Sequence, residues 1–163
     1  MSYVNIIGVV MIAISVLVFC ISVNRYHEFK SKIYAELCYL LTLLNNKMNV
    51  TNSKVSDIIS DIEPPHYLNS IKFLDDAKTN GLYKAFSIHA DKMYLDKSDR
   101  ELLSGYFKDM GYEHITLENE KLEVCLAQLK KKSALIKNEL NKKKKVSDTV
   151  IVCIGMLVIL FFI

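Results

Sequence analysis

Residues 122–163 read LEVCLAQLKKKSALIKNELNKKKKVSDTVIVCIGMLVILFFI. In the first half, residues spaced alternately by four and three positions share one face of a helix: Leu122, Leu126, Leu129, Ser133, Ile136 and Leu140. This spacing is typical of the seam of a coiled-coil-like helix. Four lysines, 142–145, then precede the uncharged segment 150–163. The stretch therefore predicts one long helix that begins as a packed amphipathic helix and ends as a membrane span.

The other end of the chain mirrors this order. Residues 4–23 carry no charge, and at about 1.5 Å per helical residue they cover the hydrocarbon core of a bilayer, about 30 Å thick. Apolar residues then recur at intervals of three and four, at Tyr26, Phe29, Ile33, Leu37, Leu40, Leu44 and Met48. We interpret 4–23 as a first transmembrane helix that continues as an amphipathic one. A secretory signal is the alternative, but no basic residue precedes Arg25.

The second predicted span, 150–163, is short. It reaches about 21 Å, or about 27 Å when counted from Val146. Bilayer thinning and snorkelling of the neighbouring lysines can accommodate this mismatch. A buried helix of the core is the alternative, and the apolar character on every face favours the span.

The charges decide the orientation. All 21 basic and 18 acidic residues lie between the two apolar ends. Arg25 follows the first span and Lys142, Lys143, Lys144 and Lys145 precede the second, so we assign these five residues to the membrane interface. The positive-inside rule then places 25–149 in the cytoplasm as one domain, with both termini on the far side.

The cytoplasmic segment is predicted to be all-α, because it shows helical periodicity and the chain has only five glycines and two prolines. We expect short helices at about 53–62, 66–79, 82–93 and 98–110, the last opened by a capping box of Ser98 and Glu101. The expected fold is an antiparallel helical bundle. Its long N- and C-terminal helices continue into the two spans, and the short helices form a membrane-distal head.

No pattern in the sequence points to catalysis. The four histidines belong to no metal motif and are expected at ordinary surface or boundary positions, and no nucleotide-binding or esterase motif occurs. The four cysteines lack the CxxC spacing of a zinc site. We therefore expect no enzyme, no cofactor and no metal. A membrane-bound enzyme built from scattered residues such as Asp75, Asp76 and His89 remains the alternative. Asp148, at the edge of a span, can pair with the nearby lysines or line an ion pathway.

The whole pattern resembles the stage III sporulation protein AB family of endospore-forming bacteria. The segments that carry the resemblance are NRYHEFKSKIYAELCYLLTLL (24–44), TNGLYKAF (79–86), KSDRELLSGYFKDMG (97–111), LEVCLAQLKKKSALIKNELNKKKK (122–145) and GMLVILFFI (155–163). The resemblance implies a cytoplasmic domain similar to the platform protein of type II secretion systems. It also implies a place in the mother-cell membrane around the forespore, in the channel complex, next to a secretion-type ATPase, stage III sporulation protein AA.

We therefore expect a non-enzymatic platform that docks this ATPase. The alternative is a small structural or pore-forming protein with two spans and no ATPase partner, which self-associates through its spans. The residues expected by their pattern to be exposed and to bind a protein partner are Asp75, Asp76, Gly81, Leu82, Tyr83, Gly111 and Tyr112. Nucleic acid is not an expected partner, because the lysines lie beside the membrane and are not interleaved with aromatic residues.

Overall fold

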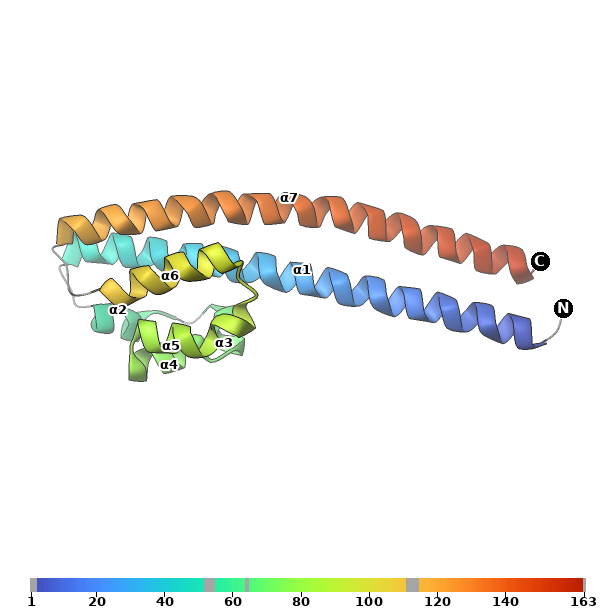
Figure 1. Ribbon diagram of the computed structural model, residues 1–163, viewed down its shortest axis with the longest axis horizontal. Helices are drawn as coiled ribbons and strands as arrows, with labels where there is room; N and C mark the ends of the chain where they lie inside the picture. Colours follow the sequence, from blue (N-terminus) through green and yellow to red (C-terminus); the bar gives the residue numbers. More distant parts are fainter. Residues whose placement is uncertain (1–2, 52–54, 64, 111–114, 163) are drawn as a thin grey trace. The chain divides into compact units, whose positions relative to one another are not determined.

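The computed structural model describes residues 3–51, 55–63, 65–110 and 115–162, and every regular element in these residues is a helix (Figure 1). The prediction of an all-α chain is confirmed. The two long helices are α1, Tyr3–Thr51, and α7, Ile115–Phe162, with 49 and 48 residues. At about 1.5 Å per residue, each is about 70 Å long. Each apolar end of the chain thus continues into its amphipathic segment as one helix, as predicted.

One helix in the described part of the chain is long and apolar enough to cross a membrane, over a stretch between Val10 and Met48. Its most apolar window has no buried side chains, and Ile12 and Phe19 are 66% and 69% exposed. This stretch overlaps the first predicted span, 4–23, at residues 10–23, and the crossing of a membrane stays a prediction. The second span, 150–163, stays a prediction, since the side chains of 157–163 lie outside the described residues.

The chain divides into two compact units, which we describe separately. One consists of residues 1–29 and 136–163, and the other of residues 30–135. The division predicted from the sequence, into a span at 4–23, a domain at 25–149 and a span at 150–163, stays a prediction.

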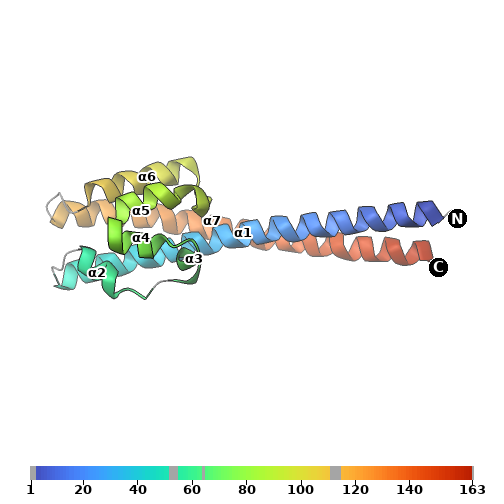
Figure 2. The same ribbon diagram turned by 90° about the horizontal axis from the view of Figure 1, so that it is seen from below.

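The 30–135 unit contains the short helices (Figure 2). They are α2 Val55–Asp61, α3 His66–Ser70, α4 Phe73–Asn80, α5 Leu82–His89, the 3-10 helix η1 Ala90–Met93, and α6 Lys97–Asp109. The largest fully buried side chains come from α1 and from the short helices: Tyr34, Phe73, Phe86, Ile33, Leu37, Leu40, Leu41, Leu44, Leu68, Leu74, Met93 and Leu103. α1 and the short helices therefore share one hydrophobic core.

The predicted helix 66–79 is wrong in one respect, because the chain breaks it at Lys72. This residue has a φ of 62°, in the left-handed region, and its N–H donates to the carbonyl of Asn69 at 2.8 Å. In a single straight helix, Phe73 would point about 140° away from Leu68. The break lets both side chains reach the core, where each is fully buried, whereas Ile71 is only half-buried.

The predicted capping box of α6 is also wrong. The helix starts one residue before Ser98, and Asp96 is its N-cap residue, with no side-chain capping bond. The Asp96 carboxylate is instead bound by lysines of α1 and α7, which leaves it unable to cap the helix.

Most of the apolar positions predicted on the long helices are buried. Those of α7 that are buried are Leu122, Leu126, Leu129, Ile136 and Leu140, and those of α1 are Ile33, Leu37, Leu40, Leu44 and Met48. Ser133 and Phe29 are half-buried and Tyr26 is exposed. The periodicity missed Tyr34, Cys38 and Cys125, which are also buried.

Candidate functional site

A polar cluster around Asp96 joins three helices of the 30–135 unit. Lys30 of α1 and Lys132 of α7 each bring Nζ to 2.6 Å from one oxygen of the Asp96 carboxylate. The hydrogen bonds from Lys132 and Lys30 hold the pKa of Asp96 below its usual range. The Asp96 N–H donates to the Tyr34 hydroxyl at 3.1 Å. This cluster fixes the start of α6 to both long helices, so we assign it a structural role.

A second polar contact fixes α3, a helix of five residues. The N–H groups of Tyr67 and Leu68 donate to the two carboxylate oxygens of Glu36 on α1, at 3.0 and 2.8 Å. These are groups in the first turn of α3, which have no partner inside the helix. A carboxylate also complements the positive end of the helix dipole. Glu36 therefore positions the segment that leads into α4.

Buried His89 of α5 pairs through Nε2 with Oδ2 of Asp76 on α4, whose side chain is partly exposed. His89 is 4% exposed, so the expectation of a surface or boundary histidine is wrong for this residue. The position of His89 is decided by contacts with residues that are not its neighbours in the sequence. Asp76 is thereby engaged in packing the two helices together, whereas the neighbouring Asp75 is exposed.

The turn between α4 and α5 lies at the rim of a cavity of about 490 Å³, here called the α4–α5 pocket. It brings together Gly81, Leu82 and Tyr83, three of the predicted binding residues. Leu82 is only 5% exposed because it packs into the core, so the expectation that it is exposed is wrong. Gly81 has a φ of 83°, so an L side chain at this position would strain the backbone of the turn. Tyr83 is 42% exposed and available to a partner.

The lining of the α4–α5 pocket combines an apolar floor with a basic rim. Ile59, Ala77 and Phe107 form buried parts of the lining. Lys78, Lys84 and Lys108, from α4, α5 and α6, are exposed and line the same cavity. None of these three lysines forms an ion pair within the described ranges. Such a lining suits an apolar side chain flanked by carboxylates. The sequence patterns did not predict this basic rim.

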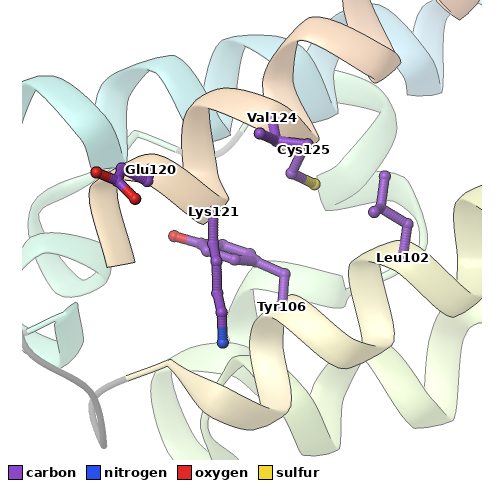
Figure 3. A pocket seen from close by; sticks show the side chains of 6 residues that line it. All are labelled: Leu102, Tyr106, Glu120, Lys121, Val124 and Cys125. Carbon is purple, nitrogen blue, oxygen red and sulfur yellow. The ribbon is translucent and has the colours of Figure 1, made fainter. Parts of the chain in front are cut away.

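A second cavity, of about 340 Å³, lies between α6 and α7 (Figure 3). Its lining is formed by Leu102, Tyr106, Glu120, Lys121, Val124 and Cys125. Figure 3 shows Cys125 on the same side of the cavity as Val124 and directed toward α6. Burial raises the pKa of the Cys125 thiol to about 12. A thiol with so high a pKa is protonated at neutral pH, so Cys125 supplies no thiolate to this cavity.

Gly111 and Tyr112, the remaining predicted binding residues, lie outside the described residues. Asp75 and Asp76 are not among the residues that line the α4–α5 pocket. The structure therefore gathers three of the seven predicted positions at one cavity. It adds the three lysines, which could have been found only by knowing that α4, α5 and α6 meet there.

The predicted membrane-interface residues lie in the other unit, and all five are exposed. Lys143 and Lys144 approach residues that follow Arg25 on α1: Lys143 Nζ lies 3.0 Å from His27 Nε2, and Lys144 Nζ lies 4.0 Å from Glu28. The Asp148 side chain lies outside the described residues. Among the residues described, no group of three or more His, Cys, Asp or Glu side chains could hold a metal ion.

The model of the stage III sporulation protein AB family matches residues 5–163, almost the whole chain. The chain belongs to this family. Neither the curated proteins nor the solved structures contain a match to it. The resemblance predicted from the sequence is confirmed. Stage III sporulation protein AB is a family of sporulation proteins and not a known enzyme family.

Proposed function

We propose that this stage III sporulation protein AB family member is a non-enzymatic membrane platform of the channel between mother cell and forespore. In this proposal it docks a secretion-type ATPase, similar to stage III sporulation protein AA, on its cytoplasmic side. The observation that carries the proposal is the α4–α5 pocket, where the exposed Tyr83 stands beside an apolar floor. Aromatic side chains next to such hollows are frequent anchors of protein interfaces.

The membrane part of the proposal has two spans, 4–23 and 150–163, with 25–149 in the cytoplasm. It is supported by the apolar stretch of α1 and by the exposed lysines 142–145. In this arrangement the mother-cell membrane around the forespore holds both spans, and both termini lie on its far side. A platform of this kind presents its docking surface to cytoplasmic partners only.

The fold proposed for the platform is an antiparallel bundle in which α7 packs along α1. Pairs of contacts support it, because residues later in α1 contact residues earlier in α7. Asn24 bonds to Ser147, and Glu28 lies near Lys144. Farther along α1, Lys30 reaches Asp96 together with Lys132 of α7. The order is that of two helices running in opposite directions.

The binding experiment uses the full chain in lipid nanodiscs and the purified secretion-type ATPase. Changing Tyr83→Ala together with Lys84→Glu should weaken binding at least about tenfold, the effect of one disturbed anchor. The helical circular dichroism spectrum should remain unchanged, because both side chains are exposed.

Two controls locate the contact. Tyr39→Ala removes a tyrosine of α1 that is 57% exposed and lies outside the pocket, and Asp75→Ala removes a predicted binding residue that does not line it. Both should bind like the unaltered chain. Undiminished binding by the Tyr83 variant would remove the pocket from the interface. If the unaltered chain did not bind at all, the structural or pore-forming alternative would replace the platform.

A further inference from the structure

The unit of residues 1–29 and 136–163 contains an apolar cavity of about 310 Å³, here called the α1–α7 pocket. Phe19, Cys20 and Val23 of α1 line it, together with Val146 and Val150 of α7. An apolar hollow of this size on the surface is unfavourable while it faces water. In a bilayer, a hydrocarbon chain is the natural occupant.

Polar and basic groups stand at one end of this pocket. Asn24 donates from Nδ2 to the hydroxyl of Ser147 at 3.0 Å, and both residues are part of the lining. Lys142 and Lys143, both exposed, complete the lining of the pocket. The lining itself is almost wholly apolar, so the two lysines contribute mainly their alkyl chains to it. The Lys143 ammonium lies beside the cavity, 3.0 Å from His27 Nε2.

The surroundings of the basic end carry an excess of positive charge. Arg25, Lys137, Lys144 and Lys145 add four cations to Lys142 and Lys143, and Glu28 and Glu139 are the acidic side chains described among them. Asp148 adds one more carboxylate in the sequence. Six cations against three carboxylates leave three positive charges for an anion to neutralise.

We infer that the α1–α7 pocket seats one anionic phospholipid, with an acyl chain in the apolar cavity and its phosphate at Lys142 and Lys143. The inference rests on the proposed insertion of α1 and α7 in the membrane and adds a defined ligand to it. A topology signal requires lysines but no cavity. A free phosphate ion would use the lysines but not the apolar lining, whereas an anionic lipid uses both.

The test uses the full chain in bilayer nanodiscs made of equal parts phosphatidylglycerol and phosphatidylethanolamine. The chain is released into mild detergent, and the lipids retained on it are identified by native mass spectrometry. We expect phosphatidylglycerol to be retained about tenfold more than phosphatidylethanolamine, as two lysine contacts to a headgroup imply.

Two pairs of variants separate charge from cavity. Lys142→Gln with Lys143→Gln should abolish the lipid preference, while the same changes at Lys130 and Lys131, exposed residues of the other unit, should leave it intact. Val23→Trp fills the cavity without changing the charge and should also prevent retention. Ile12→Trp, on an exposed part of the same helix, should not.

The outcomes also separate a failure of the lipid site from a failure of the proposed membrane insertion. If the unaltered chain is extracted from membranes by alkaline carbonate, the proposed membrane insertion is wrong and the lipid site with it. If the chain stays embedded but retains both lipids equally, or if Val23→Trp retains phosphatidylglycerol as well as the unaltered chain, the lipid site alone is wrong.

Discussion

The Tyr34 hydroxyl donates a hydrogen bond of 2.6 Å to the carboxylate of Asp99, and both side chains are buried in the 30–135 unit. The same hydroxyl accepts the backbone N–H of Asp96. One phenol group of α1 thus binds two groups at the start of α6. A buried carboxylate depends strongly on such a donor, because its transfer from water is costly.

Tyr34→Phe should lower the free energy of unfolding by about 1–3 kcal/mol, since it leaves buried Asp99 without the Tyr34 donor. The measurement is thermal unfolding of the full chain in detergent, followed by circular dichroism. Tyr39→Phe removes a hydroxyl from a side chain that is 57% exposed and should have almost no effect. Equal melting temperatures for the two variants would contradict the role given to Tyr34.

The same substitution at two glycines should have opposite effects. Gly81 has a φ of 83°, whereas Gly105 lies within α6, and neither has a neighbour within 4 Å of an added Cβ. Gly81→Ala should lower the free energy of unfolding by about 1–3 kcal/mol through backbone strain alone. Gly105→Ala should raise it by about 0.5–1 kcal/mol, because alanine favours the helix.

Urea unfolding of both glycine variants measures these changes. A neutral Gly81→Ala variant would mean that the turn between α4 and α5 does not require a left-handed residue. The α4–α5 pocket would then have a different rim from the one described.

Stability should fall in alkaline solution because of the buried thiols. Burial raises the pKa of Cys125 from 9.0 to about 12, and burial also raises the pKa of Cys38. Between about pH 9 and pH 12 the unfolded chain has therefore lost the Cys125 proton that the folded chain retains. The unfolded state gains from this ionisation, so stability falls as pH rises, by up to about 1.4 kcal/mol per pH unit for one group.

Cys125→Ala should flatten this pH dependence although it costs some stability at pH 7 through the small cavity that it leaves. The exposed Cys153 gives the control, because Cys153→Ala should keep the alkaline slope of the unaltered chain. Burial also raises the pKa of Tyr34, so part of the slope above about pH 10 should remain in both variants. An identical slope in Cys125→Ala would show that this thiol is not protected from ionisation.

The topology can be tested by labelling intact cells with a maleimide that does not cross membranes. Lys92→Cys, at an exposed position in η1, should stay unlabelled until the cells are broken. Ser2→Cys, before the first predicted span, should be labelled directly. Both are made in a Cys153→Ser background, which removes an exposed thiol near the other end. Labelling of position 92 in intact cells would reverse the orientation derived from the lysines.

Local patterns predicted most of the helices and most of the buried positions on the two long ones. The four-three spacing placed Leu122 and Leu129 in the interior, and the uncharged run before Arg25 indicated a span, because periodicity and hydropathy depend only on neighbouring residues. The same local reasoning failed at Lys72. There, the helix is interrupted, and Phe73 packs into a core formed by segments that are distant in the sequence.

The sequence by itself determined an all-helical chain of the stage III sporulation protein AB family, with apolar ends and a charged middle. Only the tertiary structure decided which polar groups pair and which remain available. Asp76 is bound by His89, and Glu36 caps a helix 31 residues away. Lys78, Lys84 and Lys108 meet at one cavity although they belong to three helices. Two polar side chains pair when they lie close together in space. Packing of the helices brings residues close that are far apart in the sequence, so no local sequence pattern contains these pairs.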